Sequence, residues 1–264
     1  LTIEFQGGEP LLNWPVVKFI VEYALTKNVK AGKRLNFALV SNLSLMTDEI
    51  YAFLAANNVS LCTSWDGPEE LHNKNRLCPS GNSYKITTAW LDKIRKKDKE
   101  RNDTAKDKPH RNMAALLTIT RFSLGSLRKI VDEYMWRGLQ TIHLRKLSYL
   151  GFSGGPARDV IGYSAEEFIA AWNDAMDYII GINLKGKLFM ERGTVIFLNK
   201  ILTPRDPGYT DLRSPCGAAV AQMAYNYNGK VYTCDEARTL ENDAFLLGDV
   251  NKQDYQKIIA SSKV

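Results

Sequence analysis

The stretch TIEFQGGEP, residues 2–10, introduces the pattern on which the fold prediction rests. Alternating apolar side chains over Thr2–Gln6 indicate a short β-strand, and a Gly-Gly-Glu-Pro turn follows it directly. The two glycines allow unusual backbone angles and close approach of a ligand, and the carboxylate of Glu9 is suited to pair with an ammonium group. A plain glycine-rich strand–helix turn explains the same residues about equally well.

Outward from this stretch, predicted strands alternate with predicted helices. We expect further strands at Leu35–Val40, Val59–Ser64, Met113–Thr120 and Thr141–Leu147, and helices at Trp14–Lys27, Asp48–Asn57, Tyr84–Lys97 and Leu127–Trp136. This alternation implies a parallel sheet with right-handed crossovers, and a barrel or part-barrel fits better than an open doubly wound sheet. In such folds the chemistry lies at the carboxyl ends of the strands.

The pattern changes after Leu147. A long amphipathic helix is predicted at Ala165–Ile182, whereas the apolar stretch Met190–Leu202 has no clear type. Residues 222–233 predict a β-hairpin that turns at Asn228-Gly229.

Composition argues against two classes of partner. Residues 92–111 hold nine Lys or Arg and five Asp or Glu, which account for four of the six net positive charges of the 264-residue chain. This basic stretch has no aromatic side chain to stack on bases, so we interpret it as a solvated helix end and expect no nucleic acid. No apolar run reaches the ~18 residues of a membrane helix, so we expect a cytoplasmic protein that binds no membrane.

Polar residues follow the second and third predicted strands. Ser41-Asn42-Leu43 ends the second, and Ser64-Trp65-Asp66-Gly67-Pro68 ends the third, with His72 and Arg76 shortly after. Each of these residues alone is more often a turn or cap residue than a ligand contact. Their position at successive strand ends, where a barrel keeps its site, favours a binding role.

Four cysteines complete the set of candidate residues: Cys62, Cys78, Cys216 and Cys234. Cys62 lies within a predicted strand and is expected in the core, and Cys78 is expected in a loop. Twelve residues separate Cys216 from Gly229, and four more precede Cys234, so the hairpin turn brings both thiols toward one metal site. A disulfide or two unconnected thiols are the alternatives.

The segments FQGGEPLLN, SNL and SWDGPEELHNKNR, in this order and spacing, resemble the radical S-adenosylmethionine (AdoMet) family, and most closely its peptide- and sulfatase-maturing subgroup. GYSAEEFIAAW and YNYNGKVYTCDEARTL extend the resemblance, from Thr2 to about Val250, and point to the maturase of the His-Xaa-Ser system. The family often has Gly where this chain has Leu43, which argues against a tight turn there. It also often has Leu where this chain has Trp65.

The resemblance implies a set of AdoMet-binding residues. The Gly-Gly-Glu-Pro turn would bind the methionine amino group, Ser64 and Arg76 the ribose and carboxylate side, and Asn42 and Asp66 would shape the pocket. The implied cofactor-binding residues are thus Gly7, Gly8, Glu9, Pro10, Asn42, Ser64, Asp66 and Arg76.

The resemblance also implies iron–sulfur clusters. The family motif Cys-x3-Cys-x2-Cys, which binds a 4Fe–4S cluster, is expected upstream of Leu1, so we expect a fragment that does not cleave AdoMet by itself. Cys216 and Cys234 resemble the opening of the SPASM extension and would be metal ligands of an auxiliary 4Fe–4S cluster. Asp235 matches a residue that takes a substrate proton in sulfatase-maturing relatives. A surface acid beside Arg238 is the equal alternative.

The sequence therefore predicts an α/β fold: a partial (β/α)6 radical SAM barrel over residues 1–149, a helical bridge over 150–207, and the start of a SPASM-like domain over 208–264. We expect the intact protein to cleave AdoMet reductively to a 5′-deoxyadenosyl radical that modifies a ribosomally synthesised peptide, with an external electron donor as partner. The alternatives are an anaerobic, formylglycine-forming sulfatase maturase, a catalytically silent peptide-binding scaffold and, least favoured, a nucleic-acid binder.

Overall fold

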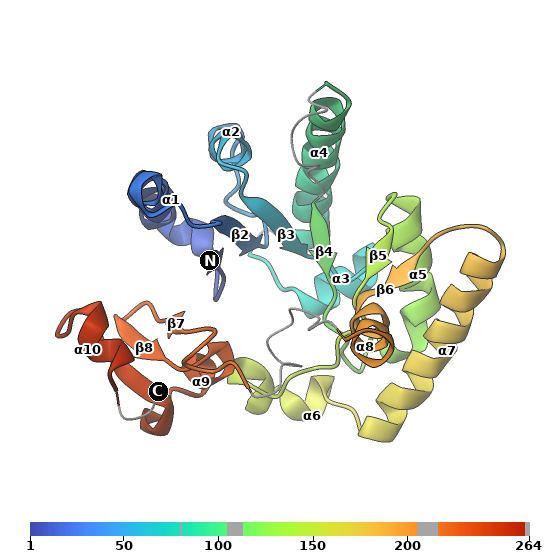
Figure 1. The fold of residues 1–264 in the computed structure, drawn as a ribbon. Coiled ribbons are helices and arrows are strands. Elements are labelled where there is room, and N and C mark those ends of the chain that lie inside the picture. Colours follow the sequence, from blue (N-terminus) through green and yellow to red (C-terminus); the bar gives the residue numbers. More distant parts are fainter. Residues whose placement is uncertain (80, 105–112, 205–215, 262–264) are drawn as a thin grey trace. The chain divides into compact units, whose positions relative to one another are not determined.

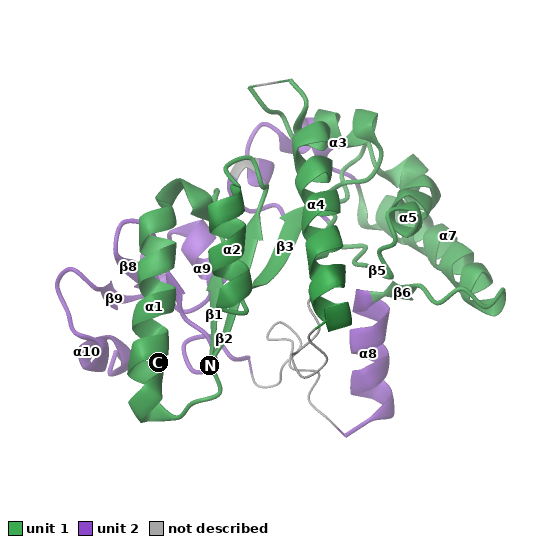
Figure 2. Ribbon diagram, turned by 90° about the horizontal axis from the view of Figure 1, so that it is seen from above, with its two compact units in different colours: residues 1–146, 164–191 green, residues 147–163, 192–264 purple. Residues whose placement is uncertain are grey.

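The computed structural model describes residues 1–79, 81–104, 113–204 and 216–261. The chain divides into two compact units (Figure 2). Unit 1 comprises residues 1–146 and 164–191, and unit 2 comprises residues 147–163 and 192–264. These limits differ from the domain limits expected at residues 149 and 207, and the division into barrel, bridge and auxiliary segment stays a prediction.

A four-stranded parallel sheet lies at the centre of unit 1, in the order β1-β2-β3-β4. The strands are β1 (Thr2–Phe5), β2 (Asn36–Ser41), β3 (Ser60–Ser64) and β4 (Ala114–Leu116). Phe5 is in register with Leu39, which in turn faces Leu61 on β3, and all three side chains are buried. The parallel order confirms the predicted α/β sheet.

Helices follow the strands as the apolar periodicity predicts. They are α1 (Trp14–Ala31), α2 (Asp48–Ala56), the short α3 (Glu69–Asn75), α4 (Ser83–Thr104) and α5 (Leu127–Trp136). Figures 1 and 2 show α1, α2 and α4 side by side over one face of the sheet. The Thr47 hydroxyl caps α2 by accepting a hydrogen bond from the Ile50 amide.

Most charged residues in the described part of the basic stretch are exposed, as expected, but three of its side chains also contact α2. Lys93 and Lys97 on α4 both bind Asp48 at the start of α2, at 2.7 and 2.9 Å. Asp98 is buried and accepts a 2.9 Å hydrogen bond from the Tyr51 hydroxyl. This half of the stretch therefore packs α4 against α2, and residues 105–112 lie outside the described part.

The predicted fifth strand, Thr141–Leu147, is mostly not a strand. Only β5 (Thr141–Ile142) forms, and it pairs in parallel with β6 (Met190–Glu191). The buried Glu191 carboxylate accepts a 3.0 Å hydrogen bond from the Leu144 amide, so a side chain replaces the strand ladder there. The long helix α7 (Ala165–Leu184) begins with a capping box between Ser164 and Glu167.

Unit 2 contains a small antiparallel sheet. Its elements are α6 (Arg158–Ile161), α8 (Arg192–Leu202), β7 (Ala224–Tyr225), β8 (Lys230–Tyr232), α9 (Asp235–Leu240), β9 (Leu246–Asp249) and α10 (Tyr255–Ile259). The β7–β8 hairpin confirms the prediction from Asn228-Gly229. Val231 on β8, Leu247 on β9 and Ile258 on α10 belong to the hydrophobic core of this sheet. None of the helices in the described ranges is long and apolar enough to cross a membrane.

The turn after β2 forms although a leucine occupies the position where glycine was expected. Leu43 adopts φ +63°, in the left-handed region, and its side chain is fully buried. Its amide donates a 3.0 Å hydrogen bond to the Ser41 hydroxyl, which helps to hold the turn. Burial of the leucine side chain therefore offsets a backbone strain of about 1–2 kcal/mol.

This strain predicts an unusual order of mutant stabilities. Leu43→Ala and Leu43→Gly should both destabilise the protein by roughly 2–5 kcal/mol through the cavity they leave, but glycine should be no worse than alanine because it relieves the strain. At Leu54, equally buried in α2, glycine should be clearly worse than alanine. Urea denaturation measures both pairs, and the same order at both sites would contradict the strain.

Candidate functional site

The carboxylate of Glu9 joins the ends of β1 and β2. Its Oε1 accepts hydrogen bonds from the Leu11 amide at 3.0 Å and the Ser41 hydroxyl at 2.9 Å. Its Oε2 accepts a 2.8 Å hydrogen bond from the Asn42 amide. Three donors thus hold a charged group at the carboxyl edge of the sheet.

Of the two glycines before Glu9, only Gly7 has a backbone conformation that favours glycine. Gly7 has φ +114°, which accounts for a glycine there. Gly8 has no such angle, and a Cβ atom added to it would meet no atom within 4 Å. Packing within the described chain therefore does not require Gly8, and the space beside it is open to a ligand.

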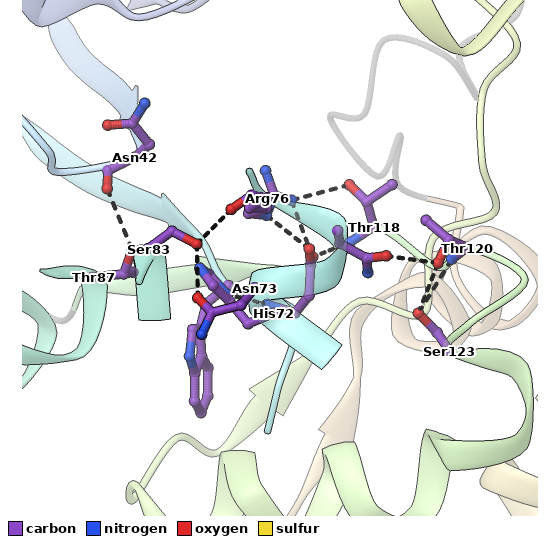
Figure 3. A network of polar contacts seen from close by, with 12 residues as sticks. Asn42, His72, Asn73, Arg76, Ser83, Thr87, Thr118, Thr120 and Ser123 are labelled. Atoms are coloured by element: carbon purple, nitrogen blue, oxygen red, sulfur yellow. Dashed lines mark hydrogen bonds and ion pairs between the residues drawn. The ribbon is translucent and has the colours of Figure 1, made fainter. Parts of the chain in front are cut away.

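A second charged group lies at the ends of β3 and β4. Arg76, just after α3, donates two hydrogen bonds to Asp66, from Nε to Oδ2 at 2.8 Å and from Nη2 to Oδ1 at 3.0 Å. The Thr118 amide donates a third, to Oδ1 at 3.0 Å (Figure 3). The Asp66 side chain is 1% exposed and that of Arg76 27%. Arg76 therefore lies between a buried carboxylate and the surface.

His72 on α3 packs beneath this pair. Its Nδ1 accepts a 3.2 Å hydrogen bond from the Asp66 amide, and its ring is fully buried. The pKa of His72 is lowered to about 4, mainly by desolvation; the Asp66 charge opposes this shift and the Arg76 charge adds to it. A neutral imidazole that accepts at Nδ1 carries its proton on Nε2, which is buried without a hydrogen-bond partner among the described residues.

A polar network extends from these strand ends into the neighbouring helices. The Ser83 hydroxyl donates to the carbonyl of Arg76 at 2.6 Å, and the Thr87 hydroxyl to that of Asn42 at 3.4 Å. The Thr120 hydroxyl donates to Asn75 Oδ1 at 2.9 Å. Figure 3 shows this network running from Asn42 to Ser123. It ties the start of α4 to the ends of both β2 and β3.

The structure places the predicted AdoMet-binding residues in unit 1, at successive strand ends. Gly7, Gly8, Glu9, Pro10 and Asn42 follow β1 and β2, Ser64 ends β3 and Asp66 follows it, and Arg76 follows α3. Asp66 differs from its expected role because its carboxylate contacts Arg76 and Thr118 in a buried position. Thr118 was not among the predicted site residues, although a Thr-x-Thr pattern ends the fourth predicted strand.

The remaining candidates lie in unit 2. The Ala219 amide donates a 2.7 Å hydrogen bond to the Thr233 carbonyl, so the segments that carry Cys216 and Cys234 run side by side. Cys216 is exposed, and Cys234 Sγ accepts a 3.4 Å hydrogen bond from the Ala237 amide. Burial raises the pKa of the Cys234 thiol. Within the described ranges, no three His, Cys, Asp or Glu side chains are grouped as metal ligands.

Asp235, the predicted proton acceptor, is ion-paired. Its Oδ1 accepts from both Nε and Nη2 of Arg238, at 2.9 and 2.6 Å. The Asp235 side chain is 37% exposed. Both the catalytic and the surface-acid interpretation are compatible with this arrangement, and the catalytic role stays a prediction.

Comparison with known proteins relates this chain to radical SAM enzymes. No family model matches it. It is 31% identical over 72 residues to the radical SAM cyclopropyl synthase TigE of Paramaledivibacter caminithermalis, a match that covers 27% of this chain and 15% of that protein. Native anSMEcpe with bound AdoMet superposes with a TM-score of 0.73 at 20% identity, over 99% of this chain and 67% of that one. The same protein with AdoMet and the Cp18Cys peptide also gives 0.73.

These matches bear on the fold and the resemblance. The chain shares the fold of anSMEcpe, and the resemblance to radical SAM enzymes indicated by the sequence is confirmed. The chain spans a small part of the curated relative and about two thirds of the solved one.

The neutral His72 predicts a pH dependence of stability. A histidine whose folded pKa is lowered from 6.5 to about 4 contributes stability that is complete above pH 6.5 and is lost as the pH falls toward 4. Between pH 7 and pH 5 this loss should be about 2 kcal/mol.

Urea denaturation of the wild type and His72→Gln at both pH values measures this contribution. Glutamine cannot gain a proton, so the variant should lose about 2 kcal/mol less than the wild type over the same interval. An equal loss in both proteins would show that His72 is not held neutral by burial.

Proposed function

We propose that the complete protein is a radical SAM enzyme that binds AdoMet at the carboxyl ends of β1 to β4 and modifies a peptide. The observation that carries the proposal is the pair of charged groups at these strand ends, Glu9 on one side and Arg76 with Asp66 on the other. The fold shared with AdoMet-bound anSMEcpe supports it.

The charges at the site suit AdoMet. Glu9, Asp66 and Arg76 together carry one net negative charge, whereas AdoMet carries a sulfonium, an ammonium and a carboxylate, hence one net positive charge. Glu9 would accept from the ammonium, with the open space beside Gly8 receiving the ligand backbone. Arg76 uses Nε and Nη2 for Asp66, which leaves Nη1 for the ligand carboxylate.

The resemblance assigns the cluster that cleaves AdoMet to a Cys-x3-Cys-x2-Cys motif, which does not occur in residues 1–264. No residue described above is therefore proposed as a ligand of that cluster. The cleavage itself requires one electron, supplied by an external donor, to break the C–S bond of the sulfonium and release methionine and a 5′-deoxyadenosyl radical. This chain would bind and orient AdoMet for that step.

Peptide modification is proposed from the matched proteins. One structure of anSMEcpe contains the Kp18Cys peptide, and TigE is named a cyclopropyl synthase. We propose a ribosomally made peptide as substrate and leave the bond formed open, because these two names do not point to one common reaction. Sulfatase maturation is the second candidate, favoured by the likeness to anSMEcpe over nearly the whole chain. A cytoplasmic location is part of the same proposal.

Cys216 and Cys234 are proposed as two ligands of an auxiliary 4Fe–4S cluster. Their adjacent segments support this role, while two thiols alone do not form a cluster site. Asp235 next to Cys234 is proposed as the acceptor of a substrate proton, and it would first have to leave Arg238.

The central test uses the complete gene product, reconstituted anaerobically with iron and sulfide and supplied with AdoMet and dithionite. We expect release of 5′-deoxyadenosine, measured by mass spectrometry. Glu9→Gln removes the negative charge and should weaken AdoMet binding by about ten- to a hundredfold. Glu22→Gln, on the exposed face of α1, is the matched control and should bind normally. With the cluster confirmed by spectroscopy, absence of 5′-deoxyadenosine would favour a silent scaffold.

Iron analysis tests the auxiliary cluster separately. The double variant Cys216→Ser, Cys234→Ser should contain about four fewer iron atoms per chain than the wild type after reconstitution. Cys78→Ser, at a cysteine in a unit 1 loop, should retain the wild-type iron content. Equal iron in all three proteins would show that these thiols bind no cluster.

A further inference from the structure

We propose that Asp66 is a positioning residue: it does not touch AdoMet but fixes the guanidinium of Arg76. The fixed guanidinium then recognises the carboxylate of AdoMet. This inference rests on the proposed function, in which Arg76 receives the AdoMet carboxylate. It assigns Asp66 a role different from that of a ligand contact.

The geometry leaves Asp66 little capacity to bind a ligand directly. Its Oδ2 accepts from Arg76 Nε at 2.8 Å, and its Oδ1 accepts from both Arg76 Nη2 and the Thr118 amide at 3.0 Å. Its side chain is 1% exposed. A buried carboxylate with three charge-assisted or backbone donors is already satisfied.

The backbone around Asp66 is held from several sides. The His72 ring accepts from its amide at 3.2 Å, and the buried Tyr134 hydroxyl donates to the preceding carbonyl, that of Trp65, at 2.7 Å. A Cβ atom on the following residue, Gly67, would lie 2.9 Å from Ile130, so this close approach of the backbone to α5 requires a glycine. The carboxylate therefore has one available position.

A fixed carboxylate fixes the plane of the guanidinium. Two parallel hydrogen bonds orient the fork of Arg76, and its Nη2 lies 3.4 Å from the Thr118 hydroxyl as a third contact. The edge that carries Nη1 is thereby presented in one orientation to the ligand. Without Asp66, the long arginine side chain would have to be ordered by the ligand itself, which weakens binding.

Pairing also controls which anions the site prefers. An unpaired arginine would attract phosphates and other simple anions, whereas Asp66 cancels its net charge and leaves directional donors. Recognition then depends on the alignment of the ligand carboxylate with Arg76 while Glu9 holds the ammonium group. The expected ligand class is a zwitterionic amino acid group that carries a sulfonium.

The experiment compares AdoMet with decarboxylated AdoMet by isothermal titration calorimetry, on the complete, cluster-reconstituted protein without reductant. The wild type should bind AdoMet at least tenfold more tightly than the decarboxylated compound. Asp66→Asn should reduce this preference to threefold or less and leave the affinity for decarboxylated AdoMet within twofold. Asp48→Asn, at an exposed aspartate that also binds two basic side chains, is the control and should keep the preference.

Each outcome decides a different point. An equal loss of affinity for both ligands in Asp66→Asn would show a merely structural role, and an unchanged preference would show that Arg76 needs no positioning. If Asp66→Asn does not fold, Asp66→Glu keeps the charge but displaces the fork, and it should also lose the preference. If the wild type binds AdoMet no more tightly than decarboxylated AdoMet, the role of Asp66 is refuted while AdoMet binding itself stands. If it does not bind AdoMet, the proposed function fails first.

Discussion

Parallel pairing of β1 to β4 is the constraint on which the site depends. Parallel strands direct all their carboxyl ends to one edge of a sheet, so residues far apart in the sequence meet there. Glu9 follows β1, Asn42 follows β2, Asp66 follows β3 and Thr118 follows β4. The hydrogen bonds from Asn42 to Glu9 and from Thr118 to Asp66 therefore link the ends of neighbouring strands. An antiparallel partner would have moved one of these groups to the opposite edge.

The site also depends on how its charges are compensated. Removing Arg76 would leave the buried Asp66 carboxylate without its cation, a loss that typically costs about 3–5 kcal/mol. His72 avoids this cost by staying neutral beneath the pair. Glu9 is instead satisfied by two amides and a hydroxyl, and no cationic side chain of the described residues pairs with it. A cationic ligand group would neutralise Glu9, as Arg76 neutralises Asp66.

Much of this arrangement could be predicted from sequence, for a physical reason. Local signals fix strand ends and turns, so the Gly-Gly-Glu-Pro turn, the residues after β3 and the Asn228-Gly229 hairpin were placed correctly. Pairing over long distances is less visible. The hydrogen bond from the Thr118 amide to Asp66 joins residues 52 positions apart in the sequence. The hydrogen bond from the Leu144 amide to Glu191 joins residues 47 positions apart. The turn at Leu43 forms because burial of the leucine side chain outweighs the backbone strain. That burial depends on tertiary packing, which the local sequence does not reveal. The apolar stretch from Met190 divides into β6 and α8, since β5 is available to pair with its first two residues.

The most direct measurement is a crystal structure of the complete protein with AdoMet. We expect the ligand at the carboxyl edge of the parallel sheet, with its ammonium about 3 Å from the Glu9 carboxylate and its carboxylate facing Nη1 of Arg76, while Asp66 stays paired. AdoMet bound away from this edge, or bound there with its carboxylate directed away from Arg76, would contradict it.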